Sequence, residues 1–246
     1  MRVLILAAGY GTRLYPVIQD TAKPLLPVAS RPIIDYLLEK TQPLPDLREV
    51  VVVTNEKFYK DFLDWAELHK DFPAPIVVMN DGTTSPEDRL GAVGDILFVL
   101  KNSRKKDALF VLGGDNLFDY SLGEFIRFAQ GKAPHVSIGL YDIRDLKAAS
   151  NFGVVQMNDQ SRIELFEEKP SRPRSTLIAM CSYFFPEPSQ PLIFDYVAKS
   201  KKTDKSGDYI HWLTEMDQVF GFKFEGEWYD IGSIETYRSA QEKFKV

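Results

Sequence analysis

The sequence contains a single cysteine, Cys181, among its 246 residues. One cysteine excludes an internal disulfide framework and is typical of proteins from a reducing compartment, so we expect a cytoplasmic location. Long apolar runs are also absent, and none approaches the roughly 18–20 residues that a membrane-spanning helix needs. The first apolar run, residues 3–8, is too short for the core of a signal peptide. We therefore expect a soluble intracellular protein with no membrane partner.

A large excess of one charge is missing too. The chain has 30 Lys and Arg against 35 Asp and Glu, which gives a formal net charge of −5. This mild acidity argues against nucleic acid as a partner, although it allows a local basic pocket. Hydrophobic residues make up 44% and charged residues 26%, which excludes disordered, collagen-like and coiled-coil chains. At this length we expect one domain over residues 1–246, with a sizeable core.

Apolar periodicity predicts the fold class. Continuous apolar runs, typical of strands buried on both faces of a parallel sheet, lie at residues 3–8, 50–53, 76–79 and 108–112. Helix-period segments separate them at residues 33–38, 58–69 and 92–100. The second half predicts strands at 135–141, 153–156, 163–167, 177–185 and 222–224, and helices at 192–199, 209–218 and 234–244. The pattern favours an α/β fold: a single Rossmann-like domain with a mixed, mainly parallel central sheet flanked by helices.

The loop after the first run reads GYGTRLYP at residues 9–16 and leaves several interpretations open. A dinucleotide fingerprint needs a third glycine where Leu14 stands, and Pro16 disturbs the required helix start. A P-loop needs Gly-Lys-Ser or Gly-Lys-Thr, which does not follow. With Arg13 as a fixed cation, the glycine turn suits the phosphates of a nucleoside triphosphate. Two glycines alone are equally compatible with a tight turn that binds nothing.

A lysine ten residues after Arg13 favours the phosphate interpretation. Lys23 opens the segment KPLLPV at residues 23–28, in which two prolines fix the backbone and the apolar residues anchor it in the core. A lone lysine is usually exposed on the surface, but this arrangement would hold a cation in place.

At this point the chain resembles the sugar-1-phosphate nucleotidylyltransferases, also called nucleotide-sugar pyrophosphorylases. The resemblance lies in LAAGYGTRLYP at residues 6–16, KPLLPV at 23–28 and the helix opening PII at 32–34. It is strongest to the glucose-1-phosphate thymidylyl- and uridylyltransferases. It implies one catalytic domain over 1–246, mainly nucleotide-binding in 1–130 and mainly sugar-binding in 131–246. Because it extends to about Asp230, it implies a transferase without an appended domain.

Two aspartates are candidates for a metal site. Asp115 follows the fourth apolar run in LGGDN, where open α/β sheets build ligand sites, and Mg²⁺ prefers one or two carboxylates plus phosphate oxygens. A simple turn also explains Asp115, and Asp230 in WYDIG equally suits a helix cap, although Ser233 is better placed for that. The resemblance implies that Asp115 and Asp230 together hold Mg²⁺.

The resemblance also implies a nucleotide site and a base-reading residue. The implied nucleotide-binding residues are Ala8, Gly9, Gly11, Thr12, Arg13, Asn80, Gly82, Gly91 and Asp115. Thymidylyltransferases carry a glutamine where Asn80 stands, and asparagine offers the same amide on a shorter arm. The chain departs from the family at Arg89 and Cys181, where glycine is frequent. These departures bear on the base and the sugar rather than on the reaction class.

The sugar phosphate is expected at FEEKP, residues 166–170. A lysine suits a phosphate and a glutamate suits sugar hydroxyls, although on its own this motif is compatible with a solvated charge cluster. In the family this pair contacts the sugar 1-phosphate, which assigns Glu168 and Lys169. The strand FGV at 152–154 and the position of Asn116 resemble further sugar contacts, with Gly153 allowing the backbone to approach the hexose.

The implied activity is Mg²⁺-dependent transfer of a nucleotidyl group from dTTP or UTP to glucose 1-phosphate. Arg13 would hold the leaving pyrophosphate, Lys23 would neutralise charge, and Lys169 would orient the sugar phosphate. CTP, another sugar phosphate and a non-catalytic regulatory subunit remain alternatives, although the retained charged residues count against the last. A nicotinamide-dependent reductase has only the Gly-x-Gly turn in its favour. The expected partners are the two substrates, and a homo-oligomer is left open.

Overall fold

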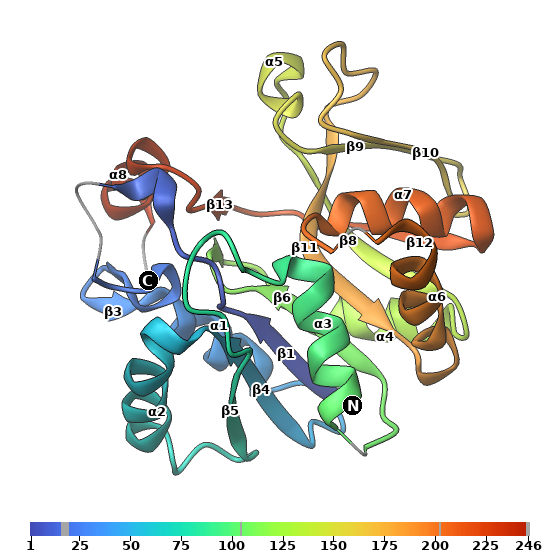
Figure 1. The fold of residues 1–246 in the computed structure, drawn as a ribbon. Coiled ribbons are helices and arrows are strands. Elements are labelled where there is room, and N and C mark those ends of the chain that lie inside the picture. Colours follow the sequence, from blue (N-terminus) through green and yellow to red (C-terminus); the bar gives the residue numbers. More distant parts are fainter. Residues whose placement is uncertain (16–19, 104, 202, 245–246) are drawn as a thin grey trace.

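A mixed sheet runs through the part of the chain described by the computed structural model, which comprises residues 1–15, 20–103, 105–201 and 203–244 (Figure 1). Its strand order is β10-β9-β11-β6-β1-β4-β5, and β8 lies beside β11 with β12 beyond it. The sheet is continuous across the two halves of the sequence, because β6 of the first half pairs with β11 of the second.

The first half builds the parallel part of the sheet. Its strands are β1 (Arg2–Leu6), β4 (Glu49–Thr54), β5 (Ile76–Asn80) and β6 (Leu109–Gly113), and its helices are α1 (Ile33–Thr41), α2 (Tyr59–Leu68), α3 (Gly91–Asn102) and α4 (Gly123–Gly131). β6, β1, β4 and β5 pair in parallel, as expected. The run at 76–79 is not buried on both faces as predicted, because β5 is the edge strand of the sheet and its residues are partly exposed. The carboxyl ends of these parallel strands lie on the same side of the sheet, and the candidate site lies there.

The second half is mainly antiparallel. Its strands are β8 (Val136–Asp142), β9 (Gly153–Met157), β10 (Ile163–Glu168), β11 (Leu177–Phe185) and β12 (Val219–Lys223), and its helices are α5 (Leu146–Ala149), α6 (Pro191–Ser200), α7 (Ser206–Met216) and α8 (Ile234–Lys243). β11 runs antiparallel to β6, β8 and β9, whereas β12 is parallel to β8. The predicted α/β fold with a mixed sheet flanked by helices is confirmed.

Short elements complete the chain. They are the strand pairs β2 (Pro27–Val28) with β3 (Arg31–Pro32) and β7 (Asn116–Phe118) with β13 (Trp228–Asp230), and the 3-10 helices η1 (Thr12–Leu14), η2 (Lys23–Leu25), η3 (Glu56–Phe58) and η4 (Glu187–Ser189). Among the helices of the described residues, none combines the length and apolarity needed to cross a membrane.

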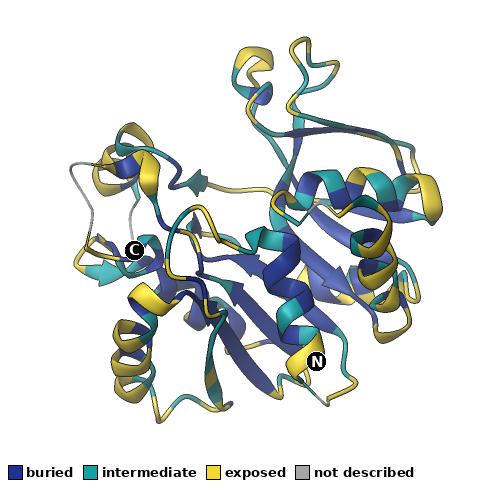
Figure 2. Ribbon diagram, viewed as in Figure 1, coloured by how far each residue is buried: buried dark blue, intermediate teal, exposed yellow. Residues whose placement is uncertain are grey.

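The sheet is covered on both faces, and its buried strands form the middle layer in Figure 2. Val3 and Ile5 of β1 contact one cluster, which contains the apolar faces of α1, α2 and α4. Leu4 points the other way, into a cluster with α3, α6 and α7. This alternation along one strand places a helical layer on each side of the sheet.

Three element boundaries differ from the sequence-based expectation. The helix expected at 209–218 is α7, which starts at Ser206 and ends at Met216, and the strand expected at 222–224 begins at Val219. Small and polar residues open α7, so its first turn carries no apolar period. Helix α4 was not expected. The β7–β13 pair was not expected either, because three-residue strands are too short for a period to be read.

Gly114 joins the end of β1 to the loop that carries Asp115. Its N–H donates to the Leu6 carbonyl at 2.9 Å. A Cβ at this position would lie 2.6 Å from that same oxygen and 2.8 Å from Cγ of Pro24. Neither neighbour is the free end of a flexible side chain, so only glycine allows the three segments to meet here.

We expect Gly114→Ala to lower the free energy of unfolding by about 1–3 kcal/mol, the usual cost of overpacking a tight site. Urea denaturation measures the change. Gly131→Ala is the matched control, because a Cβ there meets nothing within 4 Å, and its stability should match that of the parent chain. Equal stability of the two variants would contradict the proposed close packing.

Candidate active site

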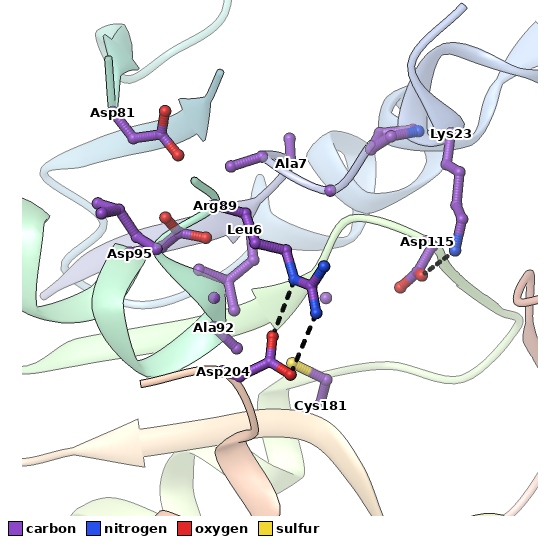
Figure 3. A pocket seen from close by; sticks show the side chains of 16 residues that line it. Leu6, Ala7, Lys23, Asp81, Arg89, Ala92, Asp95, Asp115, Cys181 and Asp204 are labelled. Carbon is purple, nitrogen blue, oxygen red and sulfur yellow. Dashed lines mark hydrogen bonds and ion pairs between the residues drawn. The ribbon is translucent and has the colours of Figure 1, made fainter. Parts of the chain in front are cut away.

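Two adjoining cavities lie at the carboxyl ends of the parallel strands, where open α/β sheets bind ligands. The first has a volume of about 260 Å³ and is lined by the end of β1, Lys23 and the start of α3 (Figure 3). The second, of about 690 Å³, is lined mainly by the second half of the chain. Ala92, Asp115, Cys181 and Asp204 line both cavities, so the two spaces meet between the end of β6 and the start of α3.

The glycine loop supplies the wall of the first cavity. Gly11 has φ +64°, in the left-handed region, and buried Leu14 anchors the 3-10 turn that follows. Ala8 and Gly9 line the first cavity, whereas Arg13 lines the second. Thr12 is exposed in the turn, and Pro16 lies outside the described residues. The loop therefore presents its backbone to one cavity and a cation to the other.

Lys23 is held in place, as its surrounding prolines and leucines predict. Only 11% of its side chain is exposed, and its Nζ lies 3.2 Å from Oδ2 of Asp115. Its stem packs over Gly11, where a Cβ would lie 3.4 Å from Cγ of the lysine. A cation fixed between the glycine loop and a carboxylate can meet a phosphate without first being ordered.

Asp115 and Asp230 are brought together by the short pair β7–β13. Asp230 pairs with Asn116 in the strand register, and the Ile231 N–H donates to the Asp115 carbonyl at 2.9 Å. Burial, followed by the charge of Asp115, raises the pKa of Asp230 to about 6. Ser233 caps α8 through its side chain, so Asp230 is not needed as a cap.

Three cations surround this aspartate pair. The positive charges of Lys23, Arg13 and Lys169 each act to lower the pKa of Asp230. Gly232 lies between Arg13 and Asp230. A Cβ at this glycine would lie 3.6 Å from Nη1 and Nη2 of Arg13 and 3.5 Å from Oδ2 of Asp230. All three residues of the expected catalytic set thus act on Asp230, Lys23 from the first cavity and Arg13 and Lys169 from the second.

The donor set fits Mg²⁺ better than a soft transition metal. No cluster of three or more His, Cys, Asp or Glu side chains suited to a metal occurs within the described residues. Mg²⁺ needs no such cage, because it keeps waters and takes one or two carboxylates plus substrate phosphates. Two adjacent carboxylates, one with a raised pKa, are a pair that a divalent cation would stabilise.

Asn116 is oriented by its neighbours. Its Oδ1 accepts from the Trp228 indole N–H at 2.8 Å, and its Nδ2 donates to Oδ1 of Asp115 at 3.2 Å. The residue is buried yet lines the second cavity. Trp228, which was not among the expected site residues, therefore orients the amide so that its oxygen faces the indole and its nitrogen faces Asp115.

The predicted sugar-phosphate residues share the second cavity. Gly153, Glu168 and Lys169 all line it, and Lys169 has φ +48° with its N–H donating to the Phe152 carbonyl at 3.0 Å. A Cβ at Gly153 would clash with the ring of Phe166, which is a packing reason for glycine here.

The Glu168 carboxylate lies against the first turn of α7. A Cβ at Gly207 would clash with it, so glycine makes the approach feasible. Burial raises the pKa of Glu168, and the charges of Lys169 and Lys205 oppose that rise. The carboxylate is thus positioned by the first turn of α7. The start of this helix was expected three residues later, at Tyr209.

The base-reading residue is less well placed than expected. Asn80 donates from Nδ2 to Glu56 and accepts from the Gly82 N–H at 2.8 Å, and neither Asn80 nor Gly82 lines the two cavities. That Asn80 reads a base stays a prediction, and its amide is already hydrogen-bonded to Glu56 and Gly82. Gly91 does line the first cavity, with φ +76°, and a Cβ there would clash with the backbone of Asp204.

Two carboxylates in the first cavity were missed. Asp81 and Asp95 line it together with the exposed ion pair between Arg89 and Asp204, whose Nε and Oδ1 are 3.0 Å apart. A signal was available for Asp95, which interrupts the apolar segment GAVGDILFVL on the buried face of α3. A charge on such a face is unusual unless it has a partner.

The chain belongs to the nucleotidyl transferase family, whose family model matches residues 2–245. This places the protein among transferases and confirms the family resemblance read from the glycine loop and KPLLPV. The solved structures agree on the fold. A putative glucose-1-phosphate thymidylyltransferase from Bacillus anthracis has a TM-score of 0.83 at 22% identity, covering 98% of this chain and 94% of that one. A UDP-glucose pyrophosphorylase complexed with UDP-glucose has a TM-score of 0.81 at 20% identity, covering 99% and 97%.

Curated relatives are similar at lower coverage of their own length. The bifunctional protein GlmU of Methanocaldococcus jannaschii is 28% identical over 94% of this chain and 51% of its own. The UTP–glucose-1-phosphate uridylyltransferase of Synechocystis is 28% identical over 98% and 62%. A glucose-1-phosphate adenylyltransferase of Mycoplasma mobile is 27% identical over 98% and 66%. The chain thus spans about half to two thirds of the length of these relatives.

The raised pKa of Asp230 predicts a pH-dependent stability. Because the pKa is about 6 in the folded protein against an ordinary 3.8, the folded state binds a proton that the unfolded chain has released. Without a divalent cation, stability should therefore fall as the pH rises from about 4 to about 6. We expect Asp230→Asn to raise the free energy of unfolding by on the order of 1–2 kcal/mol at neutral pH, and by little near pH 4.

Urea denaturation in EDTA at both pH values measures this effect. Asp64→Asn, at an exposed position on α2, is the control and should change stability at neither pH. No gain from Asp230→Asn at neutral pH would mean that burial and the charge of Asp115 do not penalise the Asp230 carboxylate in the folded protein.

Proposed function

We propose that this chain transfers a nucleotidyl group from a nucleoside triphosphate to a sugar 1-phosphate, releasing pyrophosphate. The observation that carries the proposal is the junction of the two cavities, where Asp115 and Asp230 lie together among Arg13, Lys23 and Lys169. One cavity is bounded by a glycine loop and the other by polar groups suited to a sugar. The relatives, which include uridylyl- and adenylyltransferases of glucose 1-phosphate, support the same reaction.

In the proposed step, a phosphate oxygen of the sugar attacks the α-phosphorus of the triphosphate. A new P–O bond forms, the bond from the α-phosphorus to the bridging oxygen breaks, and pyrophosphate leaves with the electron pair. A phosphate monoester is already anionic near neutral pH, since its second pKa is about 6, so the step needs no general base. What it needs is alignment and neutralisation of charge.

Each cation has a position that suits one part of this step. Lys169 lies in the sugar cavity and would orient the attacking phosphate. Lys23, fixed beside Asp115, would meet the reacting phosphates, and Arg13 would hold the leaving pyrophosphate. Asp115 and Asp230 would hold Mg²⁺, which when bound supplies charge stabilisation for the phosphate oxygens. Glu168 and Asn116 would accept or donate hydrogen bonds to sugar hydroxyls.

Family resemblance favours dTTP or UTP as the donor and glucose 1-phosphate as the acceptor, with CTP the alternative donor. The names of the relatives span uridylyl, thymidylyl and adenylyl transfer, so the base differs among them. We also propose a cytoplasmic location, on the basis of the single cysteine.

The reaction is tested by neutralising a charge on each side of the junction. We expect Lys169→Ala and Asp115→Asn each to lower kcat by about 10²-fold or more, because each removes charge complementarity that is fixed before the transition state. Pyrophosphate release measures turnover, with a matrix of triphosphates and sugar 1-phosphates supplying the substrates.

Lys101→Ala and Asp64→Asn are the matched controls, since both side chains are exposed and lie outside the two cavities. Both should retain parental turnover. Near-normal turnover in Lys169→Ala and Asp115→Asn, with folding intact by circular dichroism, would remove the assignment. Absence of pyrophosphate release with every substrate pair would remove the reaction itself.

A further inference from the structure

A pair of carboxyl groups lies at the end of the first cavity away from Lys23. Asp81 directly follows β5, and Asp95 projects from α3, where only 5% of the residue is exposed. Both line the cavity. Figure 3 shows the two on the same side of it, opposite Lys23 and Asp115. The proposed reaction makes no use of either residue.

The pair has acceptor atoms that the protein leaves unsatisfied. Oδ1 of Asp95 and Oδ2 of Asp81 are both buried, and neither accepts a hydrogen bond from a donor in the described part of the chain. The other oxygen of Asp81 is well held, because it accepts from the N–H and the hydroxyl of Thr83, each at 2.8 Å. An unsatisfied buried polar atom costs roughly 1–3 kcal/mol, so such an arrangement calls for a ligand or a shared proton.

A proton shared between the two residues pairs one oxygen of each carboxyl group. Burial, followed by the charge of Asp81 and a hydrogen bond to it, raises the pKa of Asp95 to about 8. At neutral pH the pair therefore holds one proton between its four oxygens and keeps one negative charge. The hydroxyl of Tyr10 donates to that of Thr83 at 3.3 Å, so it does not itself donate to the pair.

The position of the pair matches the base end of a bound nucleotide. The phosphates are expected at the other end of the cavity, next to Lys23 and Asp115. The backbone of residues 7–9 lines the same cavity, so a nucleoside extending from the phosphates along it would approach Asp81, after β5, and Asp95, in the second turn of α3. This inference rests on the proposed function for the identity of the ligand as a nucleotide.

We propose that Asp81 and Asp95 select a nucleobase with an exocyclic amino group at the position where uracil and thymine carry O4, which means cytosine or adenine. The N4 amino group of cytosine and the N6 amino group of adenine are donors, whereas O4 of uracil and thymine is an acceptor. An amino group can donate to this carboxyl pair, whereas a carbonyl oxygen placed there faces lone pairs and a negative charge. The donor is therefore CTP or ATP, in place of the dTTP or UTP that resemblance favours.

Two matched pairs of nucleoside triphosphates test the proposed selection of an amino-bearing base, one pair for pyrimidines and one for purines. CTP and UTP differ at position 4 of the pyrimidine, and ATP and ITP differ at position 6 of the purine. Isothermal titration with Mg²⁺, in the absence of sugar phosphate, should give a Kd at least tenfold lower for the amino member of at least one pair. The pair that discriminates identifies the base as cytosine or adenine. Equal or tighter binding of UTP and ITP overturns the proposal, as does failure of all four to bind.

Variants of the pair connect the selectivity to these residues. Asn offers an N–H₂ donor to a carbonyl oxygen, so Asp95→Asn should reduce the preference for the amino base at least tenfold. Asp81→Asn should do the same and provides a second variant if Asp95→Asn fails to fold. Asp64→Asn should leave the ratio unchanged. A ratio that persists in both cavity variants overturns the assignment.

Turnover distinguishes this inference from the proposed function. Pyrophosphate release at similar kcat/KM with CTP, ATP, UTP and ITP would overturn the base selection and leave the transferase reaction standing. Selective binding of an amino base without pyrophosphate release from any sugar 1-phosphate would support the base selection and remove the proposed reaction.

Discussion

Two like charges held side by side organise the centre of this molecule. Asp115 and Asp230 come from distant parts of the chain, and the register of β7 with β13 leaves them no freedom to separate. Burial, followed by repulsion from Asp115, raises the pKa of Asp230, and three cations from three different segments oppose that rise. Lys23, Arg13 and Lys169 therefore serve the folded protein as well as its proposed substrate, because each stabilises a carboxylate pair that burial penalises.

The same constraint places the site at the seam of the two halves. β6 ends just before Asp115 and pairs with β11, so the two halves of the chain share one sheet. At the start of α3 the connection is made by backbone, since the N–H groups of Ala92 and Val93 donate to the carbonyls of Asp204 and Thr203 at 3.0 and 2.9 Å. The exposed ion pair of Arg89 with Asp204 adds little to stability there, because solvent screens it. The seam is thus fixed mainly by sheet pairing and backbone hydrogen bonds.

Much of this arrangement could be predicted, and the limits have physical reasons. The buried parallel strands carry continuous apolar runs, and the glycine loop and Lys23 are fixed by local backbone preferences, so sequence patterns reveal them. β13 could not be read in this way, because three residues show no period and its pairing with β7 spans more than 100 residues. The base end was predicted least well: Asn80 was chosen by position in a motif, whereas its amide is engaged locally by Glu56 and Gly82.

The charges at the two ends of the first cavity would give the proposed nucleotide a direction, since the Arg89–Asp204 pair between them is neutral as a pair. Lys23 lies at the end where Asp115 meets the second cavity, and the Asp81–Asp95 pair lies at the other. A triphosphate is repelled from the acidic end and attracted to the basic end, whereas an amino-bearing base has the opposite preference. Reversed binding would therefore bring phosphates against a negative, partly desolvated pair and leave its acceptors unsatisfied. A net negative protein can in this way orient a polyanion, since what matters is the separation of charge along one small cavity rather than the total.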